Sequence, residues 1–319
     1  MSNLEYPNPL IMNRADPWIY KHTDGKYYFT ATSPEYDRIE LRVSDTLAGL
    51  DNASPRVIWK SHLDGEMSHL IWAPEIHYLF GKWHVYFAAS QTTELHKQHN
   101  TFQHRMYVIC ADEPVMGQWQ ELGQVETDLD TFSLDATVFE SKGKTFCVWA
   151  QKDPAILGNS NIYIAEMANA SSLLLPATLL TKPEYPWECS VIPVNEGPSV
   201  IRHDGRIFLT YSANATGPEY CIGLLTSNEQ DNLLDAASWV KHSIPVFMTS
   251  EENHKYGPGH NCFTYSEDGL TLLIVYHVRD YLSIEGNPLD NPDRNTCIQA
   301  VHFDNKEDLI LGIPVRCNR

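Results

Sequence analysis

The sequence has few basic residues for its size. Its 319 residues include 23 Lys and Arg against 41 Asp and Glu, which gives a formal net charge of −18. Nucleic acids and anionic membranes are bound through basic surfaces, so we expect neither as a partner, and a neutral ligand is favoured. The sequence also lacks a run of about 20 apolar residues, the length that a membrane-spanning helix requires.

The cysteines form no recognisable framework. Seven of them are spread along the chain without Cys-x-x-Cys spacing, which predicts reduced and mostly buried thiols. The first ten residues, MSNLEYPNPL, lack the basic and apolar segments of a secretory leader. A leader that had been removed would leave the same pattern. On these two grounds the sequence predicts a cytoplasmic protein.

Nucleotide-binding and serine-hydrolase signatures are absent, and helical periodicity is almost absent. In their place the chain repeats one motif, a turn glycine followed by a strand-like run of aromatic and β-branched residues. The five copies are DGKYYFTA, GKWHVYFAA, GKTFCVWA, GRIFLTYS and GLTLLIVYH. Their glycines, at 25, 81, 143, 205 and 269, are separated by 56, 62, 62 and 64 residues.

Each copy lies within a longer set of strands. An apolar strand precedes each glycine, which predicts a hairpin, and one or two further strands follow it. Five units of about four antiparallel strands predict an all-β fold, a five-bladed β-propeller formed by residues 1–319 as a single catalytic domain. A flat sandwich of twenty strands is the alternative, but it does not explain the uniform unit.

Carboxylates recur at the start of the first strand of three units. Counting back eight or nine positions from the turn glycine reaches Asp16, Asp135 and Glu196, and in the other two units Trp72 and His260. First strands lie innermost in a propeller, so these side chains are predicted to converge at one end of the central channel. Each carboxylate alone is explained equally well as the cap of a turn.

Three acids in register are harder to explain structurally, because like charges brought together raise one another's pKa. The long polar loops after the second strands, such as QTTELHKQHNTFQH and RDYLSIEGNPLDNPD, are expected to rim the same end of the channel. A pocket floored by carboxylates suits glycoside hydrolysis, in which an acid protonates the leaving oxygen and a base activates water.

Six motifs together resemble glycoside hydrolase family 43. They are NRADPWI, WAPEIH, FSLDATVF, VNEGPSV, YGPGHN and YHVR, and the resemblance runs from about residue 8 to residue 300. Members of that family are five-bladed propellers with an Asp, Asp, Glu triad and an inverting mechanism. The stretches EYDRIELR and WAPEIHY are most similar to its α-L-arabinofuranosidases.

The resemblance implies a role for each acid. Asp16 is expected to be the general base, Glu196 the general acid, and Asp135 the residue that raises the pKa of the acid and orients it. No cofactor is required for this chemistry.

The resemblance also suggests residues that bind the substrate. Trp72, Glu75 and His260 are expected to line the pocket, and Arg279 to contact the sugar or the triad. Trp18, next to the base, is expected to stack on a sugar ring. For Trp18 and Trp72 the alternative is packing between blades.

His277 is unusual within the repeat. The repeat aligns it with Thr30, Ala88, Ala150 and Ser212 of the other second strands, all of them small. In the family such a histidine commonly binds a calcium ion in the channel together with water, so the resemblance implies a structural Ca²⁺ at His277. A hydrogen-bonded neighbour of the carboxylates is the alternative, because Ca²⁺ prefers oxygen ligands.

The leading hypothesis is an exo-acting, inverting α-L-arabinofuranosidase that removes terminal arabinose from arabinan or arabinoxylan oligosaccharides. Three alternatives stay open at this point: a β-xylosidase on the same scaffold, a propeller that binds carbohydrate without catalysis, and a retaining sucrose-type glycosidase. The expected partner is therefore an arabinose-containing oligosaccharide or polysaccharide.

Overall fold

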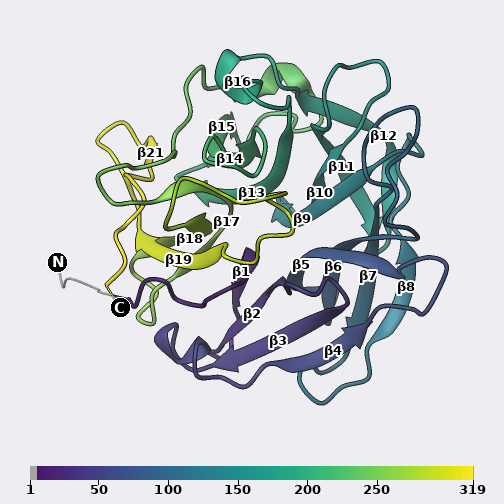
Figure 1. Cartoon of the computed structure of the whole chain (residues 1–319), viewed down its shortest axis with the longest axis horizontal. Helices are drawn as coiled ribbons and strands as arrows, with labels where there is room; N and C mark the ends of the chain where they lie inside the picture. The colour runs from purple at the N-terminus through teal and green to yellow at the C-terminus, as the bar shows by residue number, and fades with distance from the viewer. Residues whose placement is uncertain (1–5, 319) are drawn as a thin grey trace.

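The chain forms five antiparallel sheets arranged in a ring, in a computed structural model that describes residues 6–318 (Figure 1). The first strand of each sheet contacts the first strand of the next: β1 with β5, β5 with β9, β9 with β13, β13 with β17, and β17 with β1. The ring is therefore closed, and the predicted five-bladed β-propeller is confirmed.

The first four blades each have four strands in chain order. Blade one comprises β1 (Ala15–Lys21), β2 (Tyr27–Thr32), β3 (Arg38–Ser44) and β4 (Arg56–Lys60). Blade two comprises β5 (His69–Leu79), β6 (Lys82–Ser90), β7 (Arg105–Ala111) and β8 (Gln120–Gln124). Blade three comprises β9 (Ser133–Ser141), β10 (Lys144–Gln151), β11 (Asn161–Asn169) and β12 (Ser172–Thr181). Blade four comprises β13 (Asn195–His203), β14 (Arg206–Ala213), β15 (Cys221–Asn228) and β16 (Val240–Lys241).

Blade five is shorter. It comprises β17 (Tyr256–Tyr265), β18 (Leu272–Arg279) and β19 (Asn295–Ala300), and a hairpin of β20 (His302–Phe303) and β21 (Leu309–Ile310) follows it. The helices of the described chain are three 3₁₀ turns: η1 (Ala48–Leu50), η2 (Pro186–Glu188) and η3 (Ala236–Ser238). Within residues 6–318 no helix has the length and apolar character needed to cross a membrane.

Both ends of the described chain complete blade five. The N-terminal segment pairs with β19, where Thr296 N donates to Ile11 O at 2.9 Å. The C-terminal tail meets the same segment, because Asn318 N donates to Asn8 O at 3.0 Å and Asn8 N donates to Asn318 Oδ1 at 2.7 Å. Segments from opposite ends of the chain thus cover the edge that a fourth strand covers in the other blades.

The second strands are apolar on both faces because each blade packs against a neighbour on either side. In β10 every residue after Lys144 is buried, and in β18 every residue is buried. Apolar clusters join adjacent sheets, and their largest buried members are aromatic, among them Trp149, Tyr86 and Tyr211. This accounts for the unbroken apolar runs of the repeated motif.

Each innermost strand carries a β-bulge at the same height. The register breaks between Ala15 and Trp18 in β1, and at the matching place in β5, β9, β13 and β17. The first residue of each bulge has a left-handed φ: Asp16 (52°), Ala73 (46°), Asp135 (58°), Gly197 (52°) and His260 (44°). Such a bulge bends the strand and re-aims its side chains.

The bulge corrects the register inferred from the sequence. Asp16, Asp135 and His260 are the first residues of their bulges, whereas Glu196 and Trp72 lie one position earlier, paired with Ser212 and Ala88. Counting back from the glycines did not reveal this offset because the hairpin loops differ in length: five residues separate β1 from β2, whereas two separate β13 from β14.

Side chains of one blade bind the bulge of the next. Ala73 N donates to Thr32 Oγ1 at 2.8 Å, and His260 N donates to Ser212 Oγ at 2.7 Å. Thr32 and Ser212 occupy the same place in the second strands of their blades, opposite the residue before the bulge. The residue equivalent to Ser212 in blade one is therefore Thr32, and the earlier alignment on Thr30 was wrong by two positions.

The bulge of β5 offers a test of backbone strain. Ala73 has a left-handed φ, which costs an L-residue roughly 1–2 kcal/mol. Replacing it with glycine removes that cost while losing one buried methyl group, so Ala73→Gly is expected to leave the free energy of unfolding within about 0.5 kcal/mol of wild type. Urea denaturation measures the difference.

Ala89→Gly is the matched control, since Ala89 is also a buried alanine but lies within regular β6. It should lose about 1.5 kcal/mol from glycine entropy and the missing methyl group. Equal losses in the two variants would contradict the strain argument.

Candidate active site

A cavity of about 500 Å³ opens at the end of the ring where the bulges lie. Asp16, Asp135 and Glu196 all line it, so the three acids predicted from the repeat do converge. Its walls come from the loops after the second strands of blades two to five, as expected, and from the segment before β13. Representative wall residues are Leu95, Phe102, Asn159, Ile192, Thr216 and Leu289.

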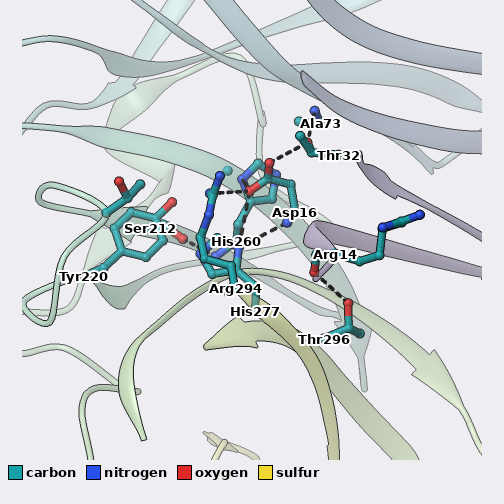
Figure 2. A network of polar contacts seen from close by, with 12 residues as sticks. Arg14, Asp16, Thr32, Ala73, Ser212, Tyr220, His260, His277, Arg294 and Thr296 are labelled. Carbon is teal, nitrogen blue, oxygen red and sulfur yellow. Dashed lines mark hydrogen bonds and ion pairs between the residues drawn. The ribbon is translucent and has the colours of Figure 1, made fainter. Parts of the chain in front are cut away.

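Asp16 is buried among hydrogen-bond donors (Figure 2). Its Oδ2 accepts a hydrogen bond from Thr32 Oγ1 at 2.6 Å, and its Oδ1 lies 3.3 Å from His260 Nδ1 and 3.4 Å from an Arg294 guanidinium nitrogen. Burial alone raises the pKa of a carboxyl group. Here His260 and Arg294 outweigh burial and hold the pKa of Asp16 well below its usual range. Asp16 is therefore a carboxylate throughout the neutral pH range.

His277 binds the backbone of Asp16. The Asp16 amide donates to Nδ1 at 3.1 Å, so Nδ1 carries no proton and its 3.2 Å approach to Asp16 Oδ1 is not a hydrogen bond. Burial lowers the pKa of His277 to about 3, which keeps the ring neutral with its proton on Nε2. His277 therefore does in blade five what Thr32 and Ser212 do in theirs: it accepts the N–H of the next bulge.

Asp135 and Glu196 form a proton-sharing pair. Enclosure, together with the nearby Asp16 charge, raises the pKa of Glu196 to about 7. Burial and the charges of Glu196 and Asp16 also hold the pKa of Asp135 above its usual range. Two coupled acids with raised pKa values retain at least one proton at neutral pH. The site thus combines an ionised carboxylate with a protonated carboxylic acid.

Each member of the pair has a fixed hydrogen bond. Gly197 N donates to Asp135 Oδ2 at 2.9 Å, and Tyr220 OH donates to Glu196 Oε1 at 2.7 Å. A Cβ at Gly197 would lie 3.1 Å from ring atoms of His260, so glycine suits both the left-handed φ and the close approach. The tyrosine ring in turn stacks on His277, with centroids 5.5 Å apart and planes 5° apart.

Trp72 and His260 line the cavity, as expected. Trp72 stacks on His104 with ring centroids 4.1 Å apart, and its Nε1 is buried without a partner among the described residues. His260 lies between two acids, with Nδ1 3.3 Å from Asp16 Oδ1 and 4.0 Å from Asp135 Oδ2.

Trp18 and Glu75 lie outside the cavity lining, contrary to expectation. Trp18 packs between blades one and two, where its Nε1 donates to Ile76 O at 2.8 Å and its ring lies 4.7 Å from that of His77. Glu75 is buried, with Oε2 3.1 Å from His77 Nε2. Both residues follow their bulges, and this places them deeper along the innermost strands.

The arginine that lies beside the triad is Arg294, whereas Arg279 was expected there. Arg279 is buried and donates to Thr216 O at 2.8 Å and to Pro288 O at 2.7 Å, so it holds two loops of the cavity rim together. Arg294 precedes β19 and reaches Asp16 because β19 pairs with β18, which carries His277. Sequence reasoning missed Arg294, Tyr220 and Thr32. Aligning the third strands on the second strands would have located Arg294.

The described side chains do not form a calcium cage. Nδ1 of His277 is engaged by the Asp16 amide, and within residues 6–318 no group of three or more His, Cys, Asp or Glu side chains is arranged to hold a metal. The Ca²⁺ expected at His277, with water as its other ligands, stays a prediction.

The floor of the cavity thus holds an ionised carboxylate and a protonated carboxylic acid, and the cavity is large enough for a sugar. This is the arrangement of a glycoside hydrolase. A family model described as glycosyl hydrolases family 43 matches residues 6–308. The chain belongs to that family, as its motifs suggested, and a carbohydrate is its substrate class.

Similar proteins include several arabinofuranosidases. The chain is 49% identical over 315 residues to an extracellular exo-α-(1→5)-L-arabinofuranosidase of Streptomyces avermitilis, which covers 98% of this chain and 64% of that protein. It is 49% identical over 285 residues to one of Streptomyces chartreusis, covering 89% of this chain and 85% of that protein. The crystal structure of an α-L-arabinofuranosidase from Lactobacillus brevis superposes with a TM-score of 0.97 at 54% identity, over 98% of both chains.

Two of these findings bear on the sequence-based expectations. The chain spans about two thirds of the length of the Streptomyces avermitilis relative. Both Streptomyces relatives are named extracellular, which contradicts the prediction of a cytoplasmic protein. The seven cysteines are free thiols in the described chain, but unpaired cysteines were not sufficient grounds for assigning a compartment.

Tyr220→Phe tests the electrostatics of the site. The phenol hydrogen bond favours the ionised form of Glu196, so its loss should raise the pKa of that group. The alkaline limb of kcat/KM reports loss of the Glu196 proton and should therefore move up by about 0.5–1 pH unit. Measuring kcat/KM of both proteins as a function of pH locates this limb. A limb that stays in place or moves down would contradict the assignment.

Proposed function

We propose that this protein is an exo-acting, inverting α-L-arabinofuranosidase that releases terminal arabinose from arabinan or arabinoxylan oligosaccharides. The observation that carries the proposal is the pairing, in one cavity, of the ionised Asp16 with Glu196, which shares a proton with Asp135. The arabinofuranosidase names of relatives at 49% identity support the choice of sugar. The cavity is rimmed by loops of four blades, and this enclosure supports attack at a chain end.

The proposed reaction is a single displacement at the anomeric carbon. Asp16 takes a proton from a water molecule as its oxygen bonds to that carbon on one face of the ring. On the opposite face the glycosidic C–O bond breaks, and Glu196 gives its proton to the departing oxygen. Water attacks from the side opposite the leaving group, so the released arabinose has the inverted anomeric configuration.

Neighbouring groups prepare both acids for these roles. Thr32 and Arg294 hold the Asp16 carboxylate in place and stabilise its charge before the reaction. Like-charge repulsion between Asp135 and Glu196 disfavours the fully ionised pair, so the pair retains a proton that Glu196 can donate. Once Glu196 has lost its proton, Tyr220 donates a hydrogen bond to the new carboxylate.

Three substrates and the stereochemistry of the product separate the proposal from its main alternatives. We expect hydrolysis of p-nitrophenyl α-L-arabinofuranoside and of linear arabino-oligosaccharides, with kcat/KM on p-nitrophenyl β-xyloside lower by about 100-fold or more. Proton NMR of the first product should show the inverted anomer. A preference for the xyloside would make the protein a β-xylosidase, retention would exclude the single displacement, and binding without turnover would exclude an enzyme.

The two acids should respond differently to substitution. Only poor leaving groups need protonation, so Glu196→Ala should lower kcat on arabino-oligosaccharides by about 10³-fold but on p-nitrophenyl arabinofuranoside by about tenfold. Asp16→Ala removes the base and should lower kcat on both by about 10³-fold. Steady-state kinetics compare the four values, with the Tm of each variant as the folding control. The same pattern of loss in both variants would overturn the assigned roles.

A further inference from the structure

A buried lysine lies outside the cavity in blade five. Lys255 directly precedes β17, and its side chain is 1% exposed. Its Nζ forms an ion pair with Asp280, which directly follows β18. The proposed glycosidase reaction uses neither residue.

Two thiols complete this cluster. Lys255 Nζ lies 2.9 Å from the Sγ of Cys317, in the C-terminal tail, and 3.9 Å from the Sγ of Cys297, on β19. The Cys317 Sγ is also 3.5 Å from both carboxylate oxygens of Asp280. A thiol is thus in contact with an amine and with a carboxylate that can accept the proton of that amine.

The two thiols differ in reactivity. Cys297 is completely buried, and burial raises the pKa of its thiol to about 12. Cys317 is only partly buried, and its Sγ lies beside the Lys255 ammonium and the Asp280 carboxylate. Cys317 is therefore the thiol that an oxidant would reach first.

We propose that Lys255 and Cys317 form an oxidative cross-link, a sulfenamide between Nζ and Sγ. A hydroperoxide first oxidises the Cys317 thiol to a sulfenic acid and is reduced to water or an alcohol. The Lys255 ammonium then passes one proton to Asp280, and the amine nitrogen attacks sulfur. The N–S bond forms as the S–O bond breaks, and the hydroxyl group leaves as water with a second amine proton.

The cross-link joins segments that close blade five. Residues 255 and 317 are 62 positions apart. The tail that carries Cys317 is already held by polar contacts: Val315 N donates to Gln299 Oε1 at 3.0 Å, and Asn253 Nδ2 donates to Pro314 O at 2.8 Å. A covalent bond at its end would keep the tail on the blade and restrict the unfolded chain.

The test uses the whole protein and hydrogen peroxide. Treatment with about one equivalent should lower the intact mass by about 2 Da. Trypsin should no longer cut after Lys255, and a linked peptide should join that lysine to the fragment that begins at Cys317. Dithiothreitol should reverse both changes, because thiols reduce an N–S bond but not a sulfinic acid.

Three variants locate the link. Cys317→Ser and Lys255→Arg should abolish it, whereas Cys297→Ser should retain it in full. A Cys297–Cys317 disulfide, loss of the link in Cys297→Ser, oxidation of Cys317 to sulfinic acid alone, or no mass change would each overturn the proposal.

The cross-linked protein should also unfold at a Tm about 5 °C higher than the reduced protein. Peroxide-treated Cys317→Ser is the matched control and should show no increase. A cross-linked protein whose Tm is unchanged would overturn the stapling role.

Discussion

The hydrogen bond from the bulge of one blade to a side chain of the preceding blade is the constraint on which the site depends. It recurs at four bulges: Thr32 receives the N–H of Ala73, Asp135 that of Gly197, Ser212 that of His260, and His277 that of Asp16. Each bond ties the functional position of one blade to the blade before it. Because the blades form a closed ring, these bonds fix the positions of the three acids relative to one another, although about sixty residues or more separate the acids along the sequence.

This arrangement lets one backbone geometry carry several chemistries. The first bulge residue is Asp, Ala, Asp, Gly or His, always with a left-handed φ. Strain of about 1–3 kcal/mol at a non-glycine residue persists only where the surrounding structure holds it, and such residues gather at functional sites. Asp135 has two roles, since the same carboxyl group accepts the N–H of the next bulge and shares a proton with Glu196.

Electrostatics then separates the roles of three similar acids. Asp16 is surrounded by Arg294, His260 and the Thr32 hydroxyl, and its charge is stabilised despite burial. Glu196 and Asp135 have no cation as close, so enclosure and mutual repulsion keep a proton on the pair. The difference between base and acid lies in the neighbours, because the carboxyl groups themselves have nearly the same intrinsic pKa.

The repeat of turn glycines and apolar strands was sufficient to predict five blades and the convergence of Asp16, Asp135 and Glu196, because both follow from short-range patterns and rotational symmetry. The resemblance of six motifs was sufficient to identify the family. Only the tertiary structure decided three features of the site: the offset of Glu196 by one position, the burial of Trp18 and Glu75, and the presence of Arg294 beside the triad where Arg279 was expected. Bulges and hairpin loops of unequal length shift side chains without changing the apolar pattern of a strand. Contacts between different blades leave no regular spacing in the sequence.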